Sequence, residues 1–152
     1  EWIDFPREGN GWSYKYARRQ WSLAKADYLR YHFLLDFEVE MLKLFKEVSQ
    51  PSYPYRLYDY DGTQVLAFMR GDLLLVFNFS PSNSYTNYGI PAPKGRYNIV
   101  LSTDEKRFDG FDRNDMYFVF YTQPEGDHDI LRLYLPSRSA IVLKKRDIVR
   151  IR

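Results

Sequence analysis

The chain has 152 residues, a length that suits one globular domain or one domain with an appendage. Its 22 Lys and Arg against 20 Asp and Glu give a net charge of +2, too balanced for a nucleic-acid-binding footprint. It has no Cys, which excludes disulfide scaffolds and thiolate metal sites. No apolar stretch is long enough to span a bilayer and no secretory leader is visible, so we expect a cytoplasmic protein without a membrane partner.

The first 21 residues, EWIDFPREGNGWSYKYARRQW, mix Trp, Asp, Arg, Gly and Asn densely. Pro and Gly within residues 1–12 predict a loop, and Ser13 is placed to cap a short helix that follows it. Such a mixture is usual in the middle of a protein, where a loop shapes a pocket, and unusual at the beginning of a chain.

A long helix is predicted from about Ala26 to Val48, ending before Pro51. Its polar residues recur every three or four positions and form one narrow stripe: His32, Asp36, Glu40, Lys43 and Glu47. Two apolar sides flank the stripe: Leu29, Phe33, Phe37, Met41, Leu44 and Val48 on one, and Tyr28, Tyr31, Leu35, Val39 and Leu42 on the other. A surface helix normally has one apolar face, so we expect two different bodies to cover this one.

From about Pro54 onward the pattern predicts strands. Asp61-Gly62 lies between two strand-like runs and indicates a hairpin, and the apolar run LLLVFNF indicates a central buried strand. Further strands are predicted in RYNIVLS, MYFVFYT, ILRLYLP and SAIVLKK. About seven strands with short turns favour an antiparallel β-sandwich. One connection, roughly residues 80–95, is long enough to be functional or to pack as a lobe of its own.

Little in the sequence indicates catalysis. His32 and His128 are the only His and lack metal-ligand spacing, and no nucleophile elbow or phosphate-binding loop appears. Glycoside hydrolysis needs two carboxylates across a cleft, and the segment DEKRFDGFDRND offers several, but a solvated charged loop explains it better. We therefore predict no catalytic residue, metal or cofactor in this chain.

The opening segment combines aromatic residues with Asp, Asn and Arg, as sugar-binding sites do. Aromatic faces stack on the apolar faces of sugar rings, and the polar groups hydrogen-bond hydroxyls. A packed loop, held by an Arg–Asp pair and buried Trp, would need the same residues. From the residues alone, the packed loop is the favoured reading.

EWIDFPREGNGWSYKYARRQW and YLRYHFLLDFEVEML closely resemble segments of glycogen (1,4-α-glucan) branching enzymes, of the α-amylase superfamily. The resemblance continues in LLLVFNFSPSNSYTNYGIPAPKGRYNIVLSTDEKRFDGFDR and in LYLPSRSAIVLKK, so it covers nearly the whole chain in order. Family members have an N-terminal β module, a central (β/α)8 barrel and a C-terminal β-sandwich. The resemblance therefore implies the tail of the barrel in residues 1–50, with its last loop and helices, and the C-terminal β-sandwich in residues 51–152. It also explains the two apolar sides of the long helix, one for the barrel and one for the sandwich.

The family's activity implies a role for the opening segment. Branching enzymes cut an α-1,4 link and transfer the released chain to a 6-hydroxyl by a retaining mechanism, with an Asp nucleophile, a Glu acid/base and a second Asp. None of these three carboxylates maps onto this chain, so we expect it to be inactive alone. The resemblance implies that the opening segment is the end of the eighth barrel loop, at the face where active sites lie. Its expected glucan-binding residues are Trp2, Asp4, Arg7, Asn10 and Tyr14.

Two other functions compete with that of a branching-enzyme portion: a free-standing carbohydrate-binding module, and a structural domain that only stabilises the barrel. The expected partners are α-glucan chains, the catalytic barrel, and further copies of the chain through the uncovered side of the helix. Arg18 and Arg19 are expected to brace the helix, and a Tyr-rich surface at Tyr53, Tyr55, Tyr58 and Tyr60 is a secondary candidate for glucan contact.

Overall fold

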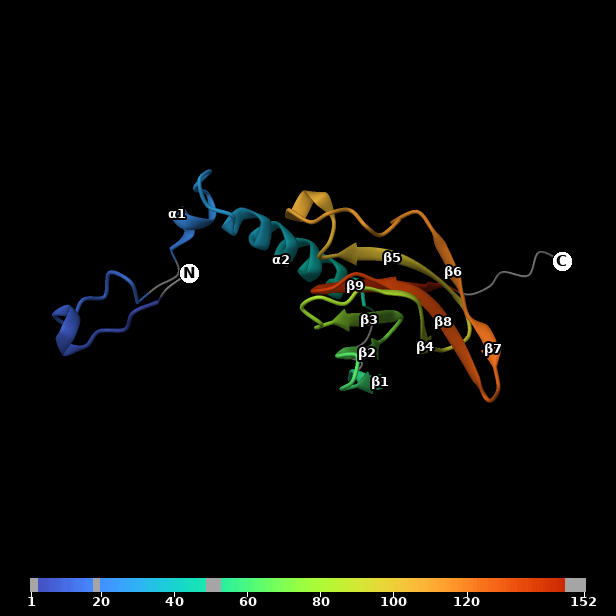
Figure 1. Cartoon of the computed structure of the whole chain (residues 1–152). Coiled ribbons are helices and arrows are strands. Elements are labelled where there is room, and N and C mark those ends of the chain that lie inside the picture. The colour runs from blue at the N-terminus through green and yellow to red at the C-terminus, as the bar shows by residue number, and fades with distance from the viewer. Residues whose placement is uncertain (1–2, 18–19, 49–52, 147–152) are drawn as a thin grey trace. The chain divides into compact units, whose positions relative to one another are not determined.

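The fold is described by a computed structural model, which covers residues 3–17, 20–48 and 53–146, with only the backbone of 57, 59 and 60. The chain divides into two compact units, Glu1–Val39 and Glu40–Arg152. The division falls inside the long helix, which Figure 1 labels α2. No helix in the described part is long and apolar enough to cross a membrane.

The first unit holds a loop and short helical elements. A 3-10 helix, η1, spans Glu8–Asn10, and α1 spans Trp21–Ala24. Residues 14–17 form a turn where a helix was expected, because the Ser13 hydroxyl accepts a bond from the Lys15 amide only two residues on. A serine turn therefore takes the place of the predicted cap.

The long helix, α2, spans Tyr31–Lys46 and begins five residues later than predicted. Residues 26–30 form turns instead, with the Leu29 amide bonded to the Ala26 carbonyl at 3.0 Å. The His32 ring nitrogen Nδ1 also bonds to the Leu29 carbonyl, so a side chain competes for that acceptor. The amides of Glu47 and Val48 bond three residues back, so a 3-10 turn continues to the predicted end.

The second unit contains nine described strands in two antiparallel sheets, which confirms the predicted mainly-β fold. The strands are β1 Tyr55–Tyr60, β2 Val65–Arg70, β3 Leu73–Asn78, β4 Tyr85–Pro91, β5 Arg96–Ser102, β6 Val119–Tyr121, β7 Gln123–Glu125, β8 His128–Leu135 and β9 Ser139–Arg146. One sheet has the order β1-β2-β3-β9-β5-β6 and the other β4-β8-β7. A short 3-10 helix, η2, spans Lys106–Phe108 between β5 and β6.

The core lies between the two sheets. Leu131, Leu133 and Leu135 on β8 are at most 1% exposed, as their alternation predicted. They pack with residues from β2, β3, β5 and β9, among them Met69, Leu74, Val76, Tyr97, Ile99, Ile141 and Leu143. β3 lies between β2 and β9, so the prediction of a central strand is confirmed.

The six-stranded sheet also buries side chains on its other face. Leu73, Leu75 and Val142 are buried but lie outside the cluster between the sheets. The C-terminal end of α2 contacts the same unit, because Phe45 lies 4.8 Å from the Arg70 guanidinium and Glu47 pairs with Lys144 at 3.6 Å. A helix on this face explains why β3 reads as a continuous apolar run.

Two turns differ in detail from the sequence prediction. The hairpin at Asp61-Gly62 forms, but its loop spans residues 61–64 and Gln64 takes the left-handed conformation with φ 56°. The long connection at 80–95 contains β4, the first strand of the smaller sheet. Asn78 has a structural role, since its side-chain amide is buried and donates to the carbonyls of residues 83, 135 and 136.

Candidate functional site

The loop of residues 4–16 brings three of the five predicted glucan-binding residues together. Arg7 Nε donates to Asp4 Oδ1 at 3.0 Å and Nη2 donates to Oδ2 at 3.3 Å. The Asn10 amide donates to Asp4 Oδ2 at 3.0 Å and also to the Phe5 carbonyl. The spacing of three residues and a turn at η1 place these side chains on one side of the loop.

The backbone of this loop is fixed by the same residues. The side-chain oxygen of Asn10, Oδ1, accepts hydrogen bonds from the backbone amides of Arg7 and Ser13. The Asp4 amide bonds to the Tyr16 carbonyl at 3.1 Å and joins the two arms of the loop. Gly9 leaves room for the guanidinium, because a Cβ there would lie 2.6 Å from Arg7 Nη1.

Hydrogen bonding sets the charge of the cluster. The bonds from Arg7, followed by that from Asn10, lower the pKa of the Asp4 carboxyl below its ordinary value. The bond to Asp4 in turn raises the pKa of Arg7. At neutral pH the cluster therefore offers a carboxylate as acceptor and a guanidinium and an amide as donors.

Aromatic side chains lie exposed on the same loop. Tyr14 is 77% exposed and is not part of the Asp4–Arg7–Asn10 cluster. Trp12 is 66% exposed and has φ 59°, with its amide bonded to the Arg7 carbonyl. Trp12 is not among the five residues predicted to bind glucan, although its place beside Gly11 and next to the polar cluster was a usable signal. Trp2, Arg18 and Arg19 lie outside the described residues.

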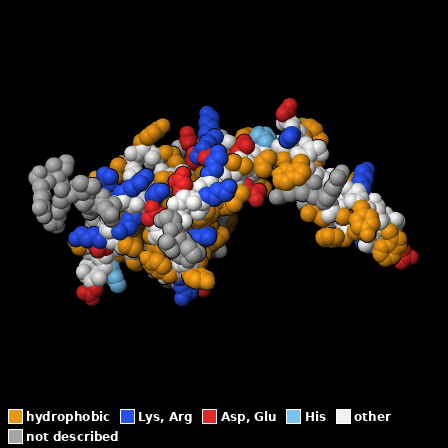
Figure 2. Space-filling model, turned by 180° about the vertical axis from the view of Figure 1, so that it is seen from behind, with side chains coloured by type: hydrophobic (Ala, Val, Ile, Leu, Met, Phe, Trp, Pro, Cys, Tyr) orange, Lys and Arg blue, Asp and Glu red, His pale blue; other side chains and the backbone are white. Residues whose placement is uncertain are grey.

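The packed-loop alternative predicted an Arg–Asp pair and buried Trp side chains, and only the first of these is found among the described residues. The Arg–Asp pair is present, but neither Trp12 nor Trp21 is buried, at 66% and 56% exposure. No described residue of the first unit is buried, and Figure 2 shows hydrophobic side chains on its surface. The loop is thus held by hydrogen bonds and not by a core of its own.

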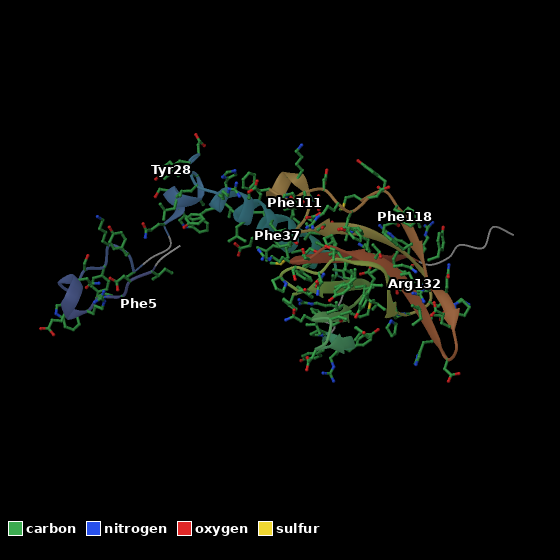
Figure 3. All side chains as sticks on the ribbon, in the orientation of Figure 1. Phe5, Tyr28, Phe37, Phe111, Phe118 and Arg132 are labelled. Atoms are coloured by element: carbon green, nitrogen blue, oxygen red, sulfur yellow. The ribbon has the colours of Figure 1, made fainter. Side chains whose placement is uncertain are left out.

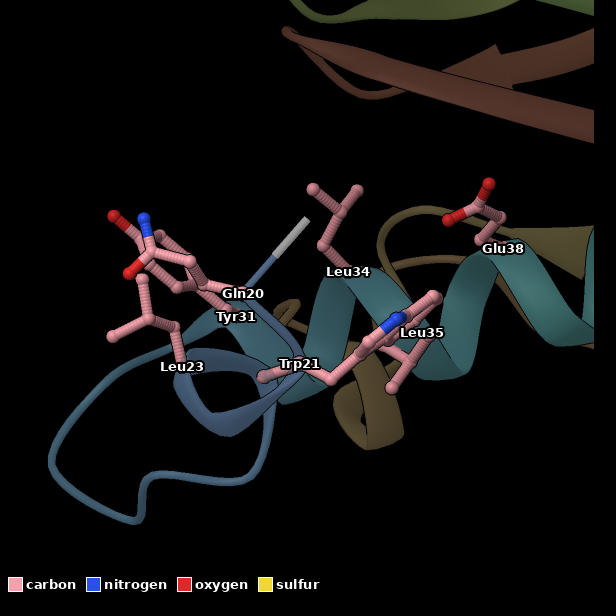
Figure 4. A pocket seen from close by; sticks show the side chains of 8 residues that line it. Gln20, Trp21, Leu23, Tyr31, Leu34, Leu35 and Glu38 are labelled. Atoms are coloured by element: carbon pink, nitrogen blue, oxygen red, sulfur yellow. The ribbon is translucent and has the colours of Figure 1, made fainter. Parts of the chain in front are cut away.

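An apolar pocket lies between α1 and α2 within this unit. Trp21, Leu23, Tyr31 and Leu35 contribute to its lining, and Figure 4 shows the Trp21 ring of α1 beside Leu35 of α2. Its volume of about 140 Å³ is below the few hundred Å³ that ligand sites usually offer. We therefore interpret it as the packing contact between the two helices.

The charged segment DEKRFDGFDRND is not merely a solvated loop. Asp104 is 5% exposed and accepts bonds from the Arg113 guanidinium at 2.7 and 3.1 Å and from the amides of Arg113 and Phe111. The expected solvated character holds for Lys106, Arg107 and Asp112, which are exposed. In the described part of the chain, no group of three or more His, Asp or Glu residues is arranged to hold a metal.

The proposed Tyr-rich surface is only partly exposed. Tyr53 and Tyr55 are 91% and 51% exposed. Tyr58 instead packs against the core, with its hydroxyl 2.9 Å from that of Tyr88. The side chain of Tyr60 lies outside the described residues. Tyr58 therefore does not belong to an outer glucan-contacting surface.

Comparison with known proteins places this fold. Residues 56–146 match the family described as "Alpha amylase, C-terminal all-beta domain". The chain belongs to this family. The match includes β2 to β9 and most of β1, so the α-amylase C-terminal domain corresponds to both sheets of the second unit.

The relatives of this α-amylase C-terminal domain include 1,4-α-glucan-branching enzymes. The horse enzyme is 42% identical over 97% of this chain, that of Rhizophagus irregularis 40% over 94%, and that of Saccharomyces cerevisiae 39% over 97%. The chain spans 22% of the length of each. A cyclomaltodextrin glucanotransferase structure, CldA, superposes with a TM-score of 0.47 at 14% identity, over 93% of this chain and 27% of CldA.

Proposed function

We propose that this chain is the C-terminal portion of a 1,4-α-glucan branching enzyme. Identity of 39–42% over nearly the whole chain, including the first unit, is the observation that supports this assignment. The parent enzyme would transfer an α-1,4-glucan chain to a 6-hydroxyl, in glycogen biosynthesis. The catalytic acids would lie in the barrel, and the 152-residue chain would be inactive alone.

The proposed chemistry is a retaining double displacement. A carboxylate nucleophile of the barrel attacks the anomeric carbon while an acid protonates the departing 4-oxygen, which leaves a covalent glycosyl intermediate. The 6-hydroxyl of a second chain then loses its proton to the same acid/base group and displaces the carboxylate. The present chain would bind and orient the glucan at the rim of the cleft.

The exposed apolar side chains of the first unit support the proposal that another domain covers it. Its described residues include no buried one, and Phe5, Tyr28 and Leu34 are 69%, 83% and 67% exposed. On α2, the apolar side through Phe33, Phe37, Met41 and Leu44 is half-buried, while Tyr31, Val39 and Leu42 on the other side are exposed. We infer that residues 1–50 form the tail of the barrel and that the barrel covers the exposed side.

The loop of residues 4–16 would be the glucan-contacting part of this chain. Asp4, Arg7 and Asn10 would hydrogen-bond sugar hydroxyls, with Trp2, Trp12 and Tyr14 as aromatic surfaces. The fixed loop backbone and the paired charges support this assignment, because preorganised polar groups lose little entropy on binding.

Variants of this loop in the enzyme that contains the chain test the proposed role. Arg7→Ala should raise KM for amylose about tenfold or more, since it removes a charged hydrogen-bond donor and frees Asp4. Lys15→Ala is the matched control, because Lys15 is an exposed cation of the same segment outside the Asp4–Arg7–Asn10 cluster. Unchanged branching and glucan affinity in Arg7→Ala and in Asp4→Asn would instead favour the structural-domain alternative.

A free-standing carbohydrate-binding module remains the second candidate. Exposed aromatic residues on a rigid polar loop are the observation in its favour. Affinity electrophoresis of the chain in gels that contain glycogen tests this second candidate. A chain that glycogen does not retard is not a carbohydrate-binding module.

A further inference from the structure

A second cavity lies in the sandwich unit, away from the loop of residues 4–16. It forms where three connections meet at one end of the sheets: residues 80–84 after β3, 103–113 after β5, and 136–138 between β8 and β9. Its volume is about 450 Å³, within the range of small-molecule sites. We name it the Phe111 cavity, lined by Asp104, Asp109, Phe111, Arg113, Ser137 and Arg138 among others.

Hydrogen bonds join the connections at 80–84 and 136–138 around the Phe111 cavity, and a bond to β9 holds the third connection beside them. The Arg138 amide bonds to the Ser80 carbonyl at 3.1 Å, and Arg138 Nε donates to the Pro81 carbonyl at 2.9 Å. The Ser137 amide donates to the Ser84 hydroxyl, and the Thr103 amide to the Ala140 carbonyl. The cavity is therefore preformed and does not depend on one loop.

The wall that carries Phe111 is rigid as well. Asp104 accepts the Arg113 side chain and the amides of Phe111 and Arg113, so one carboxylate closes the loop. Asp109 and Asp112 take left-handed conformations with φ 66° and 59°. Gly110 lies so close to the Asp104 backbone that a Cβ would collide with its carbonyl group. The loop thus fixes the backbone position from which the Phe111 side chain projects.

Phe111 presents an exposed aromatic face at this cavity. Its side chain, labelled in Figure 3, is 81% exposed. The Arg113 guanidinium lies 5.2 Å from its ring centre. A single exposed aromatic residue is not unusual by itself. Here, however, the ring stands beside converging polar groups on a rigid frame, which is the composition of a ligand site.

The charges of the Phe111 cavity favour a neutral polar ligand. Asp104 and Asp109 balance Arg113 and Arg138, so the lining has no net charge that would attract an anion. Asp109 supplies carboxylate acceptors, Arg113 and Arg138 supply guanidinium donors, and Ser137 supplies a hydroxyl that can do both. A chain of sugar rings has the matching chemistry, with hydroxyls at its edges and apolar faces for Phe111.

We propose that the Phe111 cavity binds a short stretch of an α-1,4-linked glucan chain. One sugar ring stacks on Phe111, and its hydroxyls bond with Asp109, Arg113 and Arg138. The choice of an α-glucan over other neutral sugars rests on the proposed function. The site holds a chain against the sandwich and takes no part in bond cleavage.

An NMR titration of the 152-residue chain with maltoheptaose tests the proposal. We expect amide shifts in residues 103–113 and 136–138, and a dissociation constant about tenfold or more higher in Phe111→Ala. Phe111→Trp should retain binding, and unchanged thermal unfolding of Phe111→Ala should show that the sandwich is intact. Tyr117→Ala is the matched control, because Tyr117 is 93% exposed between β5 and β6 but does not line the cavity.

Three results would overturn the Phe111 site: no shifts at millimolar maltoheptaose, shifts confined to other segments, or equal affinities of Phe111→Ala and the unsubstituted chain. Cellohexaose, the β-1,4 counterpart, should bind more weakly, and equal binding would contradict the α-glucan assignment. Failure of the proposed function is recognised separately. Branching by the whole enzyme without binding at Phe111 refutes this inference alone, whereas binding at Phe111 without branching refutes the proposed function alone.

Discussion

At the scale of single residues, Asp104 links the charge of the sandwich to its stability. Burial by itself raises the pKa of the Asp104 carboxyl, but the hydrogen bonds from Arg113 and the neighbouring amides outweigh it and lower the pKa below its ordinary value. A carboxyl whose pKa is lower in the folded state stabilises that state above its unfolded pKa. This stabilisation is lost as the pH falls through the folded pKa, below about 4.

Asp104→Asn should therefore destabilise the sandwich more at pH 7 than at pH 3. The expected loss at pH 7 is on the order of 2 kcal/mol, between that of an exposed and of a fully buried ion pair. Urea unfolding at both pH values measures it. Glu125→Gln is the control, because Glu125 pairs with Arg132 at 2.7 Å with both side chains about 40% exposed, and should cost less than about 1 kcal/mol. An equal loss at both pH values in Asp104→Asn would refute the charge-based explanation.

Residue spacing explains what could be predicted of the two candidate sites. Asp4, Arg7 and Asn10 lie three residues apart in a loop with turn signals, so their clustering follows from local geometry. The Phe111 cavity could not be predicted, since it joins three connections that are far apart in the sequence. The pairing of Asp104 with Arg113 also depends on left-handed conformations at Asp109 and Asp112, for which the sequence gives no strong signal.

At the scale of elements, periodicity predicted the strands better than the helix boundaries. Alternating Leu residues identified β8, and a continuous apolar run identified β3 as central, because both patterns reflect burial directly. The start of α2 was misplaced by five residues, since residues 26–30 are apolar enough for a helix but form turns. β4 was missed as a strand because Pro and Gly in the 80–95 connection indicated a loop.

The exposed side of α2 leads to a prediction about association. Leu34 is 67% exposed and Tyr31 40%, and apolar surface of this kind promotes contacts between copies. We expect the sedimentation coefficient of the 152-residue chain to rise with concentration, and Leu34→Lys to reduce this rise. Tyr117→Lys, at an exposed aromatic residue of the sandwich unit, should leave it unchanged. A strict monomer at high concentration would contradict this prediction.

At the scale of the whole molecule, the two units differ in how they are stabilised. The sandwich has a continuous core between two sheets and belongs to the α-amylase C-terminal domain family. The first unit has no buried residue among those described and is held by hydrogen bonds and helix contacts. Under the proposed function, contact with the catalytic barrel would explain why the first unit lacks a core of its own, whereas the sandwich is stabilised by its own core.

The most direct test of this account is a count of α-1,6 linkages formed in amylose, measured by proton NMR. The protein encoded by the complete gene that contains this sequence should introduce α-1,6 linkages, and the 152-residue chain alone should introduce none. Linkages formed by the purified chain would contradict its assignment as a non-catalytic portion. A complete protein that forms none would contradict its assignment to a branching enzyme.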